Sequence, residues 1–92
     1  MNTIPIVIPC YNRIHSLERL LQSLENAVYQ DETPLIFSID HSGSNDLYEY
    51  VQNYQWKFGE KKIIKHPKNI GLKNNILFCG NLTEKYDAVI VL

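Results

Sequence analysis

Apolar residues follow two alternating patterns along the chain. Apolar runs of five residues cover 4–8, 35–39 and 88–92, as is typical of strands buried in a parallel sheet. Between these runs, apolar residues recur every three or four positions, as they do on one face of a helix. The helical stripe after the first run consists of Ile14, Leu17, Leu20, Leu21, Leu24 and Val28. This alternation predicts an α/β fold.

Polar residues and prolines divide the segments from one another. Asn12 is the predicted N-cap of the first helix. Residues 31–34 end that helix, because the residue before a proline is disfavoured in helical geometry. Residues 44–46 begin a second helix, which we expect to end near Gly59, since glycine commonly follows a helix C-terminus.

A lysine-rich segment at 62–66 predicts a third, short strand at the edge of the sheet. Six of the nine basic residues lie between positions 57 and 73. We interpret most of them as solvent-exposed residues on and beside an edge strand. Lys68 and Lys73 are the exceptions, and we regard them as candidates for ligand binding.

A third helix begins after Gly71, and its predicted buried face consists of Leu72, Ile76, Cys79 and Leu82. Right-handed crossovers then favour the strand order 3-2-1-4. The predicted fold is a three-layer, Rossmann-like parallel sheet with helices on both faces, in one domain over residues 1–92.

Polar residues gather where the strands end. Residues 9–13 follow the first strand, residues 40–44 the second, and residues 66–73 the third. In open parallel sheets, ligands bind in the crevice outside the carboxyl ends of the strands. We therefore expect these three segments to border one ligand site.

Three side chains in these segments suit a nucleotide. Tyr11 offers a flat face on which a base can stack, and Asp40 can accept hydrogen bonds from a base N–H or from ribose hydroxyls. The alternative for Asp40 is a turn in which it binds the backbone of residues 42–44. Arg13, at the start of a helix, can hold a phosphate, or it is an ordinary surface arginine.

Composition excludes several classes of protein. A net charge of −1 gives no reason to expect nucleic acid as a partner. No apolar run approaches a membrane span and no signal peptide is visible, so we expect a cytoplasmic protein with Cys10 and Cys79 as reduced, buried thiols. The glycine-rich phosphate-binding motifs Gly-x-Gly-x-x-Gly and Gly-x-x-x-x-Gly-Lys-Ser do not occur, and neither does a nucleophile elbow. The histidines lack metal-ligand spacing.

Three motifs resemble those of one enzyme family, the inverting, family-two glycosyltransferases with a GT-A fold. Residues 6–13 (IVIPCYNR) are similar to the opening strand and nucleoside-bordering loop of that family. Residues 39–44 (IDHSGS) resemble its Val-Asp-Asp-Gly-Ser motif, and residues 66–72 (HPKNIGL) resemble its Asn-x-Gly segment. The resemblance covers essentially the whole chain and implies the amino-terminal, nucleotide-binding half of a GT-A domain.

The resemblance also implies a UDP-sugar as donor, a glycan acceptor, and a role for Asp40 in contacting the uracil. The nucleotide-binding residues that it suggests, together with the reasoning above, are Pro9, Tyr11, Asn12, Arg13, Asp40, Ser42, Gly71 and Lys73. His41 replaces the second aspartate of the motif; in this and in Arg13 the chain also resembles GlcNAc-transferases of the N-glycan branching type.

In that family, an acidic motif that binds Mn²⁺ or Mg²⁺ follows the fourth strand. The corresponding position here would come directly after Leu92, the last residue of the sequence. We therefore expect the metal site and the catalytic base to lie in a longer parent protein, cytoplasmic or peripheral at the membrane. Residues 1–92 alone are expected to bind no metal and to transfer no sugar. The apolar strand at 88–92 predicts self-association through the sheet edge.

Two other interpretations remain at this point. A sugar-nucleotidyltransferase shares the architecture but needs a glycine-rich loop after the first strand, and residues 11–15 contain no glycine. A non-catalytic flavodoxin-like or receiver-like binding module needs an acidic cluster at the tip of that strand, where this chain has Asn12 and Arg13.

Overall fold

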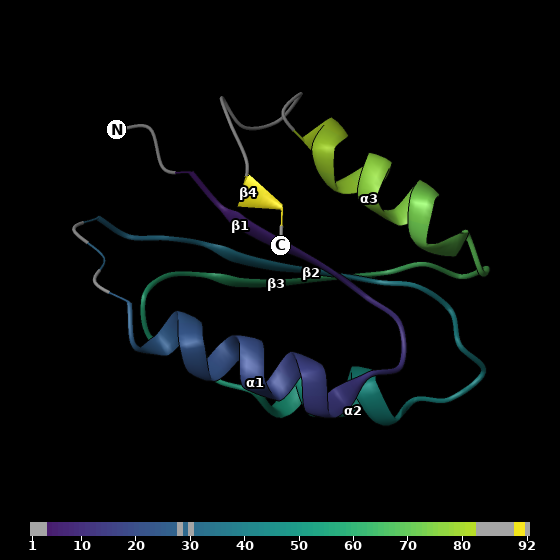
Figure 1. Ribbon diagram of the computed structural model, residues 1–92, viewed down its shortest axis with the longest axis horizontal. Coiled ribbons are helices and arrows are strands. Elements are labelled where there is room, and N and C mark those ends of the chain that lie inside the picture. The colour runs from purple at the N-terminus through teal and green to yellow at the C-terminus, as the bar shows by residue number, and fades with distance from the viewer. Residues whose placement is uncertain (1–3, 28, 30, 83–89, 92) are drawn as a thin grey trace.

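The computed structural model describes residues 4–27, 29, 31–82 and 90–91, in which strands and helices alternate (Figure 1). The elements are β1 (Ile6–Cys10), α1 (Ile14–Glu25), β2 (Leu35–Ile39), α2 (Asp46–Asn53), β3 (Lys61–Lys65), α3 (Gly71–Asn81) and β4 (Ile90–Val91). The four strands are parallel and lie in the order β3-β2-β1-β4, which confirms the predicted topology. No helix in the described ranges is long and apolar enough to cross a membrane.

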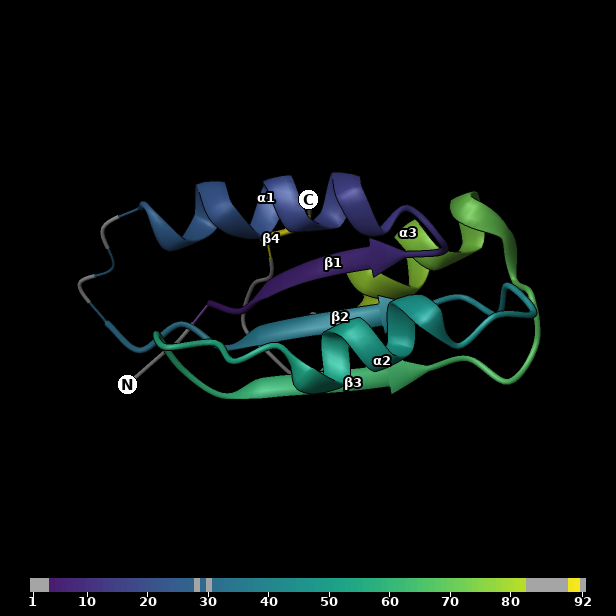
Figure 2. The same ribbon diagram turned by 90° about the horizontal axis from the view of Figure 1, so that it is seen from below.

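Helices cover both faces of the sheet. Figures 1 and 2 show α1 and α2 on one face and α3 on the other, so the predicted three layers are confirmed. The larger apolar cluster lies under α1 and α2, where Ile8, Leu21 and Phe37 are buried. The fully buried members of the α3 side, within the described residues, are Val7, Ile36 and Cys79. The two faces therefore differ in how much apolar surface holds their helices.

The first strand begins and ends two residues later than the apolar run predicts. Its pairing with β2 extends from Ile6 opposite Leu35 to Cys10 opposite Ile39, so Pro9 lies within the strand. The Ile6 N–H donates to the carbonyl of Pro34, the residue just before β2. Because successive N–H groups alternate in direction, the missing N–H of Pro9 faces away from β2. Proline thus costs no hydrogen bond between β1 and β2.

Two helices end earlier than their sequence signals predict. Helix α1 ends at Glu25, well before residues 31–34, and Val28 falls outside the described residues. Its N-cap is Arg13 and not Asn12, and no side chain caps it. Helix α2 ends at Asn53 and not near Gly59.

The end of α2 is set by a lysine from β3. Lys61 Nζ donates to the carbonyl oxygens of Val51, Gln52 and Tyr54 at 2.8, 2.9 and 2.7 Å. Carbonyls at a helix C-terminus lack the full set of helical partners, and Val51 O here accepts only a longer bond of 3.2 Å from the Tyr54 N–H, so the ammonium group caps the helix. Burial lowers the pKa of Lys61. The interpretation of the lysines as solvent-exposed residues of an edge strand is therefore wrong for Lys61. The prediction that this strand lies at the sheet edge is confirmed for β3.

The buried face of α3 also differs from the prediction. Its buried residues are Asn75 and Cys79, whereas Leu72 is 70% exposed and Ile76 45% exposed. The apolar positions at 72 and 76 thus point away from the sheet, and a polar side chain takes the inner position. A strand was predicted at 88–92, and the structure describes β4 at Ile90–Val91. Residues 88, 89 and 92 lie outside the described residues. Ile90 is 47% exposed, whereas the prediction had it buried.

Candidate functional site

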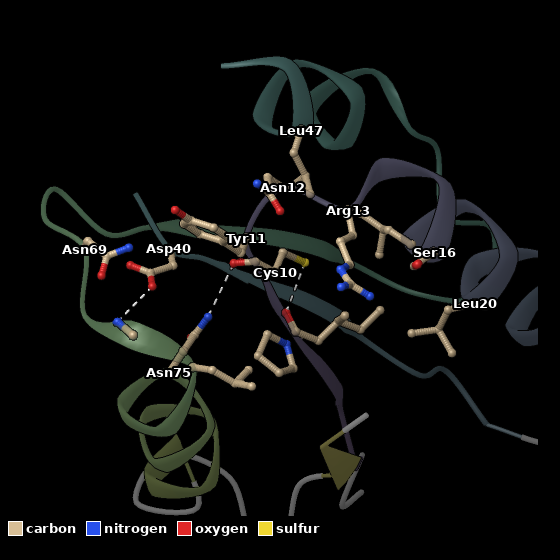
Figure 3. Close-up of a pocket in the computed structure, with 15 residues that line it drawn as sticks. Cys10, Tyr11, Asn12, Arg13, Ser16, Leu20, Asp40, Leu47, Asn69 and Asn75 are labelled. Carbon is tan, nitrogen blue, oxygen red and sulfur yellow. Dashed lines mark hydrogen bonds between the residues drawn. The ribbon is translucent and has the colours of Figure 1, made fainter. Parts of the chain in front are cut away.

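A cavity of about 690 Å³ opens at the carboxyl ends of β1 and β2, between the starts of α1 and α3 (Figure 3). Its lining includes Pro9, Tyr11, Asn12, Arg13, Asp40 and Gly71, which the sequence singled out. The other two candidates lie outside it. Ser42 is half-buried in a turn, where its Oγ donates to Ser44 O at 3.2 Å, and Lys73 is exposed on α3. The cavity therefore brings together six of the eight predicted residues.

The turn from β1 into α1 supplies the exposed part of the lining. Tyr11 is 45% exposed, and its ring lies beside Asp40 and Asn12 (Figure 3). Arg13 extends from the start of α1 between Cys10 and Ser16 (Figure 3). This turn thus presents an aromatic face and a cation to the same space.

Asp40, at the tip of β2, is 4% exposed and uses both carboxylate oxygens within the protein. Oδ1 accepts hydrogen bonds from the backbone N–H groups of His41 and Ile70, each at 2.8 Å, and Oδ2 accepts one from Gly71 at 2.9 Å. Two of these donors lie at the N-terminus of α3, where a negative charge is stabilised by the helix dipole. The turn with residues 42–44, considered as the alternative for Asp40, is wrong.

Gly71 allows α3 to start at this point. Its φ angle of +81° lies in the left-handed region, which side chains other than glycine rarely adopt. Asn69 supports the same loop, because its Nδ2 donates to His41 O at 3.0 Å. The segment before α3 is therefore tied to the segment after β2 by side-chain and backbone contacts.

Asn75 is a lining residue that sequence reasoning missed. It is 2% exposed, and its Nδ2 donates to Ser38 O at 3.0 Å and to Cys10 O at 3.4 Å. The sequence held one signal for its burial. Asn75 lies four residues before Cys79, which was predicted to be buried, and positions i and i+4 share a helix face. Side chains from α3, β1 and β2 thus meet under the cavity.

The described lining of the cavity carries few charged groups. Among the described lining residues, Asp40 is the one carboxylate and Arg13 the one permanent cation. Burial, and then the neighbouring Cys79, raise the pKa of Cys10 to about 12, so this thiol stays protonated near neutral pH. In the part of the chain that the structure describes, no group of three or more His, Cys, Asp or Glu side chains is placed to hold a metal ion.

Comparison with known proteins places the chain in a family. The model of the family described as "Glycosyl transferase family 2" matches residues 6–84, a segment that runs from β1 past the end of α3 and contains the entire described lining of the cavity. No curated protein and no solved structure matches the chain. The match spans most of the sequence and includes all three motifs that resemble glycosyltransferases. The chain therefore belongs to glycosyl transferase family 2.

Proposed function

We propose that this chain binds the nucleotide part of a sugar-nucleotide donor, a UDP-sugar, for transfer of the sugar to a glycan acceptor. The observation that carries the proposal is the meeting of Tyr11, Arg13 and Asp40 around one cavity at the carboxyl ends of parallel strands. Family membership agrees with this function and gives no support to the nucleotidyltransferase or receiver-like interpretations.

The base would lie between Tyr11 and Asp40. A carboxylate offers about four acceptor sites, and Asp40 uses three of them on backbone N–H groups. One site on Oδ2 is left for a single N–H donor, which matches the imide N–H of uracil. Stacking on the Tyr11 ring would add about 1–3 kcal/mol.

The diphosphate would lie toward Arg13 and the start of α1. The first turn of α1 carries no acidic residue and no side-chain cap, so its N–H groups are open to an anion. A guanidinium beside them can form charge-assisted hydrogen bonds with phosphate oxygens. Asn12 and Pro9 complete this side of the cavity.

A divalent metal does not fit the described residues. Asp40 is the sole carboxylate of the described lining, and both of its oxygens already hold backbone N–H groups. No described lining residue is placed as a general base for an acceptor hydroxyl. We therefore propose that residues 1–92 bind the donor nucleotide without transferring its sugar, and that a longer parent protein supplies the metal and the base.

Titration with UDP, uridine and ADP, followed by NMR, tests the proposal. We expect UDP to shift the amides of Tyr11 and Gly71 and to bind more tightly than ADP. Arg13→Gln should weaken UDP about tenfold, the usual effect of one charge-assisted hydrogen bond, and leave uridine unchanged. Arg19→Gln, on the exposed part of α1 and away from the cavity, is the matched control. Equal binding of UDP and ADP, or equal effects of the two variants, would contradict the proposal.

A further inference from the structure

Helix α3 is attached to the sheet by a buried polar side chain as well as by apolar contacts. Its two buried residues are Asn75 and Cys79, whereas Leu72 is 70% exposed and Leu77 54% exposed. The apolar cluster beneath it is small among the described residues. Hydrogen bonds therefore act beside this small apolar cluster in docking the helix.

Asn75 uses its whole amide group for this docking. One Nδ2 proton is donated to Cys10 O on β1 (Figure 3) and the other to Ser38 O on β2. Oδ1 accepts from the Ser38 hydroxyl at 2.5 Å. No donor is left for a ligand. Asn75 thus joins α3 to the ends of two strands at the floor of the cavity.

His66 extends the connection to the end of β3. The single hydroxyl proton of Ser38 is donated to Asn75, so Ser38 Oγ must accept from His66 Nε2, 2.8 Å away. This assigns the imidazole proton to Nε2. The same ring packs edge-on against Phe78 of α3, with centroids 4.7 Å apart.

We infer that Asn75 is a positioning residue for the nucleotide cavity. Together with Asp40, it holds α3 in place as one wall, to which α3 contributes Gly71, Leu72 and Asn75. A ligand in contact with this wall binds the docked helix more tightly than the detached one. Ligand binding and α3 docking are then thermodynamically linked. The choice of ligand rests on the proposed function, whereas the role of Asn75 in docking does not.

Amide hydrogen exchange across residues 72–81 tests both parts. In the free chain, Asn75→Ala should speed exchange in α3 about tenfold, the effect of losing one or two hydrogen bonds. UDP at ten times its dissociation constant should slow exchange in α3 of the native chain about tenfold. A helix with a structural role alone would not respond to the ligand in this way.

Asn74→Ala is the matched control. Asn74 is exposed, and its Nδ2 donates to Ile70 O within the same segment at 2.8 Å. It should leave α3 exchange and its response to UDP unchanged. If Asn75→Ala fails to fold, Ser38→Ala removes one of the same hydrogen bonds and should speed exchange to a smaller degree.

Two results would overturn the inference. Native exchange rates in Asn75→Ala, or in a folded Ser38→Ala, would show that Asn75 does not hold α3. Shifts at Tyr11 on adding UDP, with no slowing in α3, would show that binding and docking are not linked. Absence of any nucleotide binding would instead refute the proposed function and the linkage between binding and α3 docking. Exchange rates of the native chain and the Asn75→Ala variant without ligand would still decide whether Asn75 holds α3.

Discussion

Oδ2 of Asp40 lies 2.9 Å from the backbone nitrogen of Gly71, the first residue of α3 and 31 positions further along the chain. The carboxylate therefore fixes the start of one cavity wall to the tip of β2. In the proposed function it would also accept a base N–H. A loss of UDP binding in an Asp40 variant would not separate these roles, which is why Arg13 serves as the test.

Asp40→Asn should lower the free energy of unfolding by about 2 kcal/mol. The NH₂ group of the asparagine would replace one carboxylate oxygen, so a backbone N–H that has an acceptor in the native chain would face a donor in the variant. Urea denaturation measures the change. Asp31→Asn, an exposed position, is the control and should have little effect. Equal stability of the two variants would show that the carboxylate does not support α3.

Lys61→Met should lower the free energy of unfolding by about 1–2 kcal/mol, since three carbonyls at the end of α2 lose the ammonium donor while the apolar stem is kept. Lys62→Met, on the exposed side of the same strand, should change stability by less than about 0.5 kcal/mol. Denaturation curves of both variants make the comparison. Equal effects would contradict the capping role of Lys61.

Alanine substitutions at two glycines should have opposite effects. A Cβ at Gly59 would collide with the backbone carbonyl of Thr33, so Gly59→Ala should be destabilising. A Cβ at Gly80, within α3, meets no atom within 4 Å beyond its chain neighbours and its own helix backbone, and Gly80→Ala should stabilise the protein by about 0.5–1 kcal/mol. Thermal unfolding reports both changes, and a stabilised Gly59→Ala would refute the close approach at Thr33.

The stability contributed by Cys10 should decrease at alkaline pH. Its folded pKa, about 12, lies above the ordinary value of 9.0, so the thiol contributes fully below about pH 9 and loses its contribution as the pH rises toward 12. The difference in unfolding free energy between the native chain and Cys10→Ala should therefore shrink over this range. A constant difference would indicate an ordinary pKa in the folded protein.

The β4 edge should promote self-association. In the described residues β4 is an outer strand, and Ile90 is 47% exposed. Sedimentation at increasing concentration should show dimers or larger species, and Ile90→Lys should reduce them. A clean monomer at high concentration would contradict this expectation.

The sequence by itself determined the class of fold, the strand order, the family and the edge of the sheet at which the cavity lies. Apolar periodicity reports which faces are buried, and chain connectivity with right-handed crossovers restricts the order of the strands. Residues that follow parallel strands must meet at one edge of the sheet. Tyr11, Arg13 and Asp40 could be brought together on that basis alone.

The tertiary structure alone decided the partners of Asp40, Asn75 and Lys61. The floor of the cavity contains the carbonyls of Cys10 and Ser38, and buried carbonyls require donors. Asn75 meets that requirement, which is why an apolar pattern placed Leu72 and Ile76 on the wrong face. These hydrogen bonds join residues far apart in the chain, so they depend on how the packed elements approach one another, which local periodicity does not encode.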